Sequence, residues 1–180
     1  MGLVDRRPNR GAIVAVITPA HLASMFESMA ELEALCATLA AERMTLVERR
    51  ELDFRHQQSK RFVDLDAEDE YEAFNSTFHS ALYRGSHSSH IEELTLTTRA
   101  RLAPFRRVQF RLDGRLARSW NEHNAIVTAI LSSDGAAAAS AAKAHVSFVS
   151  VASATYISGA SDISAGSEHH TIRLTAICRS

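Results

Sequence analysis

Apolar residues recur at helical spacing over most of this chain. Thr18 and Pro19 predict an N-cap followed by proline at the first helical position. Apolar positions then alternate in steps of three and four to about Arg43, at Leu22, Met25, Met29, Leu32, Cys36 and Leu39. The pattern predicts one long amphipathic helix.

The same reasoning predicts five more helices. Their expected limits are Thr45 to about Lys60, Asp66 to about Arg84, Ser88 or Ser89 through Leu102 with a kink at Pro104, Arg115 to Leu131, and Asp134 to about Tyr156. The connections between them are short. Six helices joined in this way predict an all-α fold, an antiparallel bundle.

The two ends of the chain depart from this pattern. Residues 1–17 contain two short β segments around a Pro-Asn-Arg-Gly turn, which predicts a hairpin. A lone hairpin is marginally stable in water, so we expect it to belong to something larger. Residues 158–180 are rich in Ser and Gly and predict a poorly ordered tail. The bundle itself is expected over residues 18–157.

Composition narrows the classes of function. Glycine (7) and proline (3) are scarce, which favours helices, and the net charge of −1 supplies no global positive field for nucleic acid or acidic lipid. The two cysteines make no disulfide framework. Because no apolar run approaches the roughly 20 residues that span a bilayer, and no secretory segment is evident, we expect no membrane partner and a cytoplasmic location.

Three histidines interrupt the apolar stripes of three different helices. His79 lies one turn after Asn75, His123 continues a line of apolar residues, and His145 lies among alanines. A single histidine on an apolar face is most often a hydrogen-bonded core residue. An unpaired buried imidazole, however, costs about 1–3 kcal/mol, and one divalent metal ion would satisfy all three.

Four segments carry a family resemblance in the order of the chain. Residues 74–83 resemble a motif in which Asp and His, four apart, precede an Ala-Leu run. Residues 122–134 resemble a Glu-His-x-x-Ile…Ala-Ile…Asp stretch, residues 143–146 a terminal Ala-His, and residues 32–41 a first helix. Each motif alone is weak, but the ordered set resembles the FCD domain of GntR-family transcription regulators of the FadR type.

The resemblance implies a site and its ligands. Asn75, His79, His123 and His145 would bind a divalent metal ion, such as Zn, Ni or Mn, beside a small organic acid effector. Arg99 matches the arginine of the family's fourth helix and is the candidate for the effector carboxylate, with Arg101 as the alternative.

Three positions depart from the family pattern. Asn75 stands where the family usually has Asp, Met29 where arginine is common, and Ser88 where Asn is frequent. A neutral amide is a weaker ligand than a carboxylate for a hard cation, so the first departure reduces the expected metal affinity and favours anionic effectors.

The hairpin resembles the wing that ends a winged-helix DNA-binding domain, with Arg6, Arg7 and Arg10 as a remnant of its DNA contacts. No helix-turn-helix precedes it in this sequence. The resemblance therefore implies a homodimeric regulator that binds operator DNA only in the intact parent protein. We expect this chain alone to bind no specific operator.

Other interpretations remain open at this point. The chain could be a metal-free effector domain, a small helical metalloenzyme, or a truncated remnant without function. The enzyme is disfavoured because di-iron bundles need two Glu-x-x-His pairs and none occurs here, and because Glu122 should point about 100° away from His123. We expect four further histidines to be exposed or capping: His21, His56, His87 and His90. Three further arginines are expected to be surface charge: Arg106, Arg107 and Arg111.

Overall fold

The computed structural model describes residues 4–6, 12–14 and 18–164 of the chain. The described residues contain six α-helices: α1 (Pro19–Arg43), α2 (Leu46–Asp64), α3 (Glu68–Arg84), α4 (Ser89–Arg107), α5 (Arg115–Leu131) and α6 (Gly135–Ser164). A 3-10 turn, η1 (Val108–Arg111), follows α4. The predicted six-helix bundle is confirmed.

Two short strands precede the helices. β1 (Val4–Arg6) pairs antiparallel with β2 (Ala12–Val14), with Val4 opposite Val14. Arg6 lies in β1, whereas Arg7 and Arg10 fall outside the described residues. That these strands are part of a wing stays a prediction.

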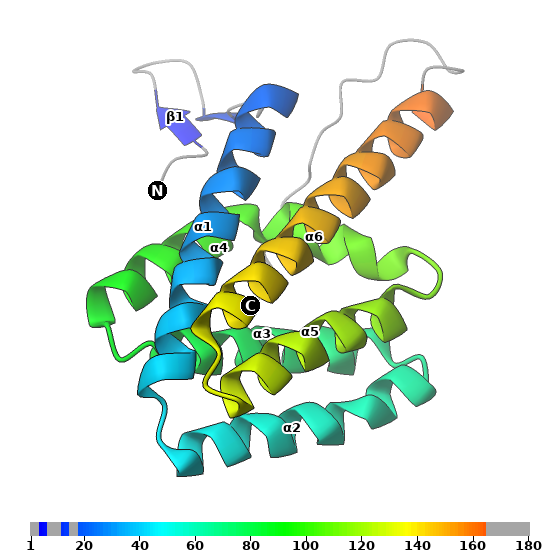
Figure 1. Ribbon diagram of the computed structural model, residues 1–180. Coiled ribbons are helices and arrows are strands. Elements are labelled where there is room, and N and C mark those ends of the chain that lie inside the picture. The colour runs from blue at the N-terminus through cyan, green and yellow to red at the C-terminus, as the bar shows by residue number, and fades with distance from the viewer. Residues whose placement is uncertain (1–3, 7–11, 15–17, 165–180) are drawn as a thin grey trace.

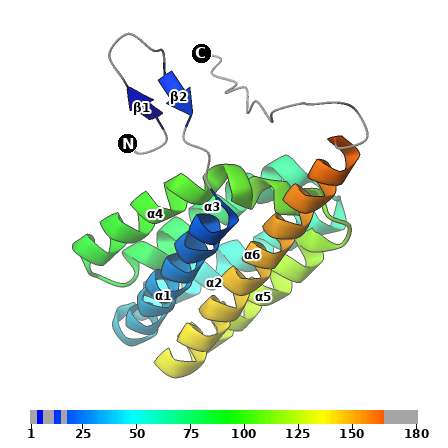
Figure 2. The ribbon, with the colours of Figure 1, turned by 90° about the horizontal axis from the view of Figure 1, so that it is seen from above.

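The helices α1 and α6 run antiparallel, side by side (Figures 1 and 2). Buried alanines on both helices, among them Ala37, Ala40, Ala138 and Ala142, allow this close packing. The helix α5 packs between α6 and α2, and α4 packs against α1 and α3. The core therefore lies where α1, α3, α5 and α6 meet.

Side-chain caps fix three of the predicted helix starts. Thr18 accepts from the backbone N–H of His21 at the start of α1, and Thr45 forms a capping box with Glu48 at the start of α2. The carboxylate of Asp134 accepts from the backbone N–H of Ala137 in the first turn of α6. Local sequence decides these positions.

The predicted start of the third helix is wrong. Asp66 has a φ of 51°, outside helical conformation, and α3 begins at Glu68 after Ala67, which makes no side-chain cap. The chain needs a left-handed residue there to turn from α2 into α3, and Asp tolerates that conformation better than most residues.

Two helices run further than the pattern predicts. α2 continues to Asp64 rather than Lys60, and α6 continues to Ser164, past the expected boundary at 157. Pro104 lies inside α4, which passes through it and ends as η1. Residues 165–180 of the predicted tail lie outside the described part of the chain.

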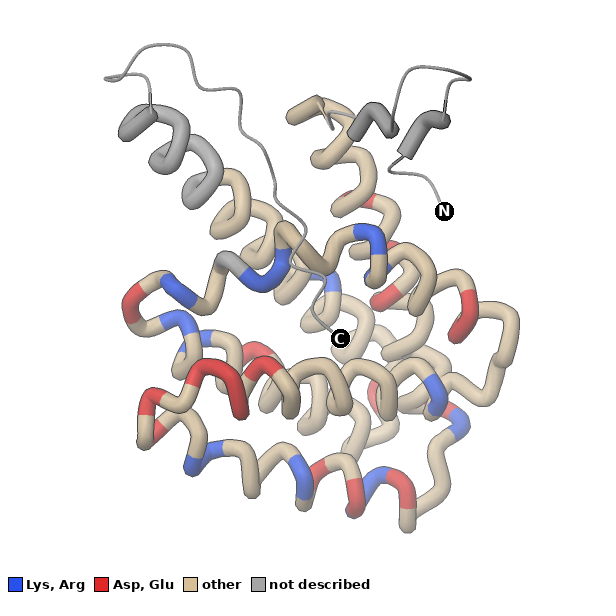
Figure 3. The backbone as a smooth tube through the Cα atoms, turned by 180° about the vertical axis from the view of Figure 1, so that it is seen from behind, with Lys and Arg blue, Asp and Glu red and all other residues tan. Residues whose placement is uncertain are grey.

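The surface carries charges of both signs. Acidic and basic residues alternate along α2 (Figure 3), with i,i+4 pairs Arg55–Glu51 and Lys60–Asp64. Within the described residues, no helix is both long and apolar enough to cross a membrane.

Candidate metal centre

The imidazole rings of His79, His123 and His145 meet in the middle of the bundle. They come from α3, α5 and α6, and each is at most 1% exposed. Their ring centroids are 4.8–5.1 Å apart, and one nitrogen from each ring lies within 4.8 Å of the others. Three separate helices thus bring three potential ligands to one point.

Carboxylates occupy the outer side of two of these rings. Nδ1 of His145 lies 2.8 Å from Oε2 of Glu122, and Nδ1 of His79 lies 3.3 Å from Oε2 of Glu33. An ionised carboxylate can only accept, so Nδ1 of His145 carries the proton and its Nε2 keeps a free lone pair. This pairing of carboxylate and histidine is the usual arrangement around metal ions in proteins.

The inner ring nitrogens are without hydrogen-bond partners. Within the described residues, Nε2 of His79, Nε2 of His145 and both ring nitrogens of His123 are buried and make no hydrogen bond. Each such atom costs about 1–3 kcal/mol. Neutral imidazoles with free nitrogens that converge are the donors that a divalent transition metal ion prefers, so the residues present fit such an ion.

Burial also sets the charge of the three rings. It lowers the pKa of His79 and His123 well below the usual value, and Arg99 (for His79) and His145 (for His123) lower it further. Burial lowers the pKa of His145 as well, against the opposing effect of Glu122. The rings are therefore neutral at pH 7, as ligation requires.

Asn75 is placed to contribute an oxygen. It lies on α3 one turn before His79, is 6% exposed, and its Oδ1 makes no hydrogen bond to the described residues. A buried acceptor left without a donor is uncommon, which gives the amide a reason to face a cation or a ligand.

A buried ion cluster surrounds Glu33 on α1. Its Oε1 accepts from Tyr83 Oη at 2.6 Å, from Arg99 Nη1 at 3.1 Å and from Arg106 Nη1 at 3.3 Å. Burial raises the pKa of Glu33, but His79 and the two arginines outweigh it and hold the pKa well below its usual range. Glu33 is thus an ionised carboxylate with no exposure to water.

The arginines of α4 divide into buried and exposed. Arg106, expected at the surface, is 5% exposed, because it follows Leu102 by four residues and so lies on the same buried face of α4. The side chain of Arg99 is 12% exposed, whereas Arg101 is exposed. Arg107 is exposed and pairs with Glu72, and Arg111 is exposed on η1.

His56 is a second residue whose predicted location is wrong. It was expected at the surface, but it is buried and its ring stacks on Trp120 at 4.6 Å, with His123 6.4 Å away. It follows buried Leu52 by one turn of α2, which places it in the core. His21, His87 and His90 are exposed as predicted.

Glu122 also has a role that the sequence did not reveal. It does point away from His123 around α5, but α6 packs on that side and brings His145 to it. Arg115 holds Glu122 through two hydrogen bonds, at 2.8 and 3.2 Å, and donates through Nε to Gln109. The carboxylate is therefore fixed in place.

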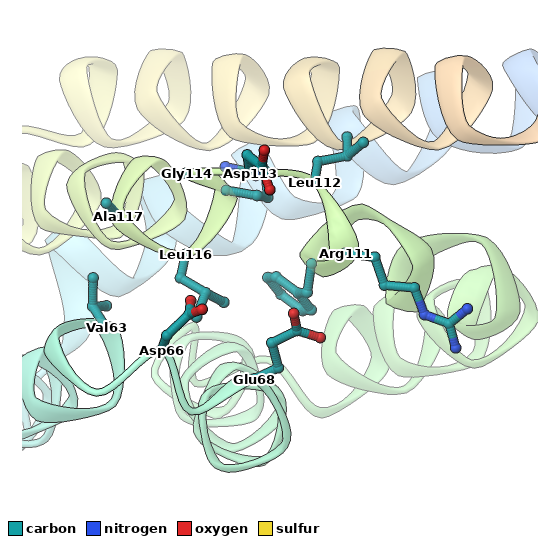
Figure 4. A pocket seen from close by; sticks show the side chains of 11 residues that line it. Val63, Asp66, Glu68, Arg111, Leu112, Asp113, Gly114, Leu116 and Ala117 are labelled. Atoms are coloured by element: carbon teal, nitrogen blue, oxygen red, sulfur yellow. The ribbon is translucent and has the colours of Figure 1, made fainter. Parts of the chain in front are cut away.

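Two cavities lie near these residues. The smaller, about 110 Å³, is lined by Asn75, Arg99 and Arg106, with Glu72 and Arg107 also on its wall. The larger, about 180 Å³, lies between the α2–α3 turn and the start of α5, with Asp66, Glu68 and Asp113 on its wall (Figure 4). The larger cavity contains none of the predicted site residues.

Residues 24–148 match the family model of the FCD domain. The chain belongs to the FCD domain family. No curated protein matches it. Its fold is similar to solved structures: McbR/YncC of E. coli (TM-score 0.73, 15% identity, 86% of this chain and 74% of that one) and the metal-free FCD domain of TM0439 (0.64, 16%, 81% and 99%).

A third similar structure is GntR of Streptococcus agalactiae, with a TM-score of 0.59 and 18% identity over 82% of this chain and 74% of that one. At these identities the likeness shows the fold. This FCD fold, confirmed for the present chain, is the helical frame on which the three histidines meet.

Proposed function

We propose that this chain is the effector-binding domain of a ligand-responsive transcription regulator of the GntR family, FadR type. It binds one divalent metal ion, Zn, Ni or Mn, through His79, His123 and His145, with Asn75 as an oxygen ligand. The observation that carries the proposal is the convergence of buried imidazole nitrogens that have no other partner.

The effector of the proposed regulator is a small organic acid, and Arg99 is its candidate carboxylate ligand. Arg99 lies on the wall of the smaller cavity beside Asn75, with its guanidinium largely sheltered from water. A sheltered guanidinium binds a carboxylate more strongly than an exposed one, which favours Arg99 over Arg101.

Binding would be coupled to DNA through α1. This helix follows residues 1–17, which resemble the wing of a winged-helix DNA-binding domain. It also carries Glu33, which contacts Arg99. An acid that changes this contact acts on the helix nearest the DNA-binding domain, and in a homodimer it would change how the two domains are oriented.

The metal content of purified protein tests the proposal. Protein prepared without chelators should contain about one ion per chain after exposure to Zn, Ni or Mn, and His123→Ala should lose it, because removing a direct ligand costs more than the roughly 10- to 100-fold typical of indirect partners. His90→Ala, at an exposed position, is the matched control.

Unchanged metal content in His123→Ala would show that the site is assigned wrongly. Wild-type protein that takes up no ion but binds acids in a thermal-shift screen would favour the metal-free effector domain. The neutral amide of Asn75 is consistent with that alternative, because it is a weaker metal ligand than a carboxylate. Turnover of an acid by the metal-loaded protein would favour the metalloenzyme.

A further inference from the structure

The helix α2 presents one row of side chains to solvent. It packs against α5 and α3 and forms the lower edge of the fold in Figure 1. Its buried residues are Leu52, His56 and Ser59. On the opposite side of the helix, steps of four and three residues define what we call the outer row: Val47, Glu51, Phe54, Gln58, Arg61 and the C-cap residue Leu65, all exposed. At 100° per residue the row stays within about 40° of one line along the helix.

Three large apolar side chains in the outer row face water. Val47 and Leu65 are each 76% exposed, and Phe54 is 60% exposed. A single exposed apolar side chain is common and needs no explanation. Three of them on one line, at the spacing of a helix-pair seam, are instead typical of a helix that packs against a partner helix.

The outer row is complementary to itself when two copies of α2 run antiparallel. A twofold axis at the level of His56, midway along the row, sets which residues of the two copies face each other. The pairs are then Val47 with Leu65, Glu51 with Arg61, and Phe54 with Gln58, and each pair forms twice. Apolar side chains therefore meet at both ends, opposite charges meet next to them, and Phe54 packs on the aliphatic part of an amide side chain at the centre.

Charge favours this arrangement over a parallel one. In a parallel pair in register, Glu51 would face its own copy and Arg61 would face its own copy, so both contacts would be repulsive. In the antiparallel pair both contacts are attractive. Glu51 also accepts from Arg55 within α2, but both side chains of that pair are more than half exposed, so it contributes little and leaves the carboxylate accessible.

We propose that the outer row of α2 is a self-association surface, on which α2 of a second copy of this chain packs antiparallel. The inference goes beyond the proposed function, which assigns no surface to the contact between copies. It does not depend on the metal centre either, since α2 carries none of the proposed ligands. One helix pair is a small interface, so the association is weak and depends on concentration.

Charge reversal tests the pairing, with sedimentation velocity of the full chain as the measurement. Glu51→Arg puts two positive side chains at each of the two contacts, and Arg61→Glu puts two negative ones there. Each variant alone should associate at least about tenfold more weakly than the wild type, because two attractions become two repulsions. An equal mixture of the two variants should recover the wild-type affinity, since both contacts of the mixed pair again join opposite charges.

Two further variants complete the test. Arg84→Glu, at an exposed position in the last turn of α3, is the matched control for the change of charge and should leave association unchanged. Phe54→Ser should weaken association, and mixing it with the wild type should not recover the full affinity. Because the substituted side chains are exposed in the single chain, the midpoint of denaturant unfolding should stay the same in all four variants.

A wild-type chain that stays monomeric up to about 1 mM would overturn the inference, because even a weak specific interface is populated at that concentration. Association that both reversals leave unchanged would overturn it in favour of another face, such as that of the exposed Leu35, Leu94 and Leu96 on α1 and α4. Weakening that mixing does not reverse would also overturn it, as an effect of net charge alone. A chain that binds no metal but associates as described would contradict the proposed metal centre and support this inference.

Discussion

Two carboxylates, the partly buried Glu122 and the buried Glu33, face two of the three histidines, and they are held in different ways. Glu122 is bound by Arg115, all three of whose guanidinium nitrogens are engaged, with Glu122 or with Gln109. Glu33 is bound by Arg99 and Arg106, and Nη2 of Arg106 has no hydrogen-bond partner among the described residues.

This difference suggests separate roles for the two sides of the histidine centre. The Glu122 side is closed: its hydrogen bonds are complete, so it orients His145 and has nothing left to bind. The Glu33 side is open: among the described residues, one of its guanidinium nitrogens, Nη2 of Arg106, is buried without an acceptor. The third ring, His123, has no carboxylate within hydrogen-bond distance among the described residues.

The largest expected loss of stability comes from removing the charge of Glu33, the carboxylate of the open side. Glu33→Gln leaves Arg99 and Arg106 buried without a counter-charge, and breaking a buried ion pair in this way costs about 3–5 kcal/mol of the free energy of unfolding. Denaturant unfolding measures it. The control is Glu31→Gln on the same helix, whose exposed pair with Lys143 is worth at most about 1 kcal/mol. Equal losses in the two variants would remove the distinction between the two sides.

The pH dependence of the metal-free protein gives the next effect. The folded pKa of His79, His123 and His145 is lowered by burial, below an unfolded value near 6.5. Below pH 6.5 the unfolded chain therefore binds more protons, and the free energy of unfolding falls as pH falls, by about 1.4 kcal/mol per pH unit for each ring. The three rings together give at most about 4 kcal/mol per unit, and His56, whose pKa burial also lowers, adds to this.

The carboxylates of Glu33 and Glu122 change the free energy of unfolding only at lower pH. The folded pKa of Glu33 and of Glu122 is lowered, so their contribution is complete above an unfolded value of about 4.3 and is lost only below it. Urea unfolding with chelator at pH 7.5, 6.5 and 5.5 therefore isolates the histidines. His123→Ala should reduce the slope by about 1.4 kcal/mol per unit. A flat profile in this range would mean that the rings are not buried as neutral groups.

Sequence reasoning predicted the helices where local signals decide them. Thr18, Thr45 and Asp134 cap helices as expected, because a side-chain cap depends on residues three positions away. Asp66 has the same type of side chain but lies in a left-handed turn between α2 and α3, whose geometry is set by the packing of those helices. Local sequence carries no information on that packing.

The site was predictable to the extent that its residues interrupt apolar stripes. His79, His123 and His145 do so, and the structure brings them together. Glu33 also occupies a buried position, four residues after Met29 and three before Cys36, and Arg106 follows Leu102 by four. Both were missed because a lone charge on a helix is usually solvated. Only the packing of α1 against α4 makes each the other's partner.

Substitution of Glu122, on the closed side, should have the smallest effect on stability, and its effect on metal affinity tests whether Glu122 orients His145. Glu122→Gln keeps an acceptor for Arg115 but removes the negative charge beside Nδ1 of His145, so its effect on stability should be smaller than that of Glu33→Gln. Metal affinity should fall about 10- to 100-fold, because a carboxylate on Nδ1 raises the basicity of the ring and fixes its orientation.

Competition with a chelator of known affinity measures that change, and binding of the acid provides the contrast. If Glu122 acts only through His145, the affinity for the acid should survive in Glu122→Gln once enough metal is added to saturate the site. If acid binding disappeared at saturation, the two carboxylates would share one task, and the division into a closed and an open side would be wrong.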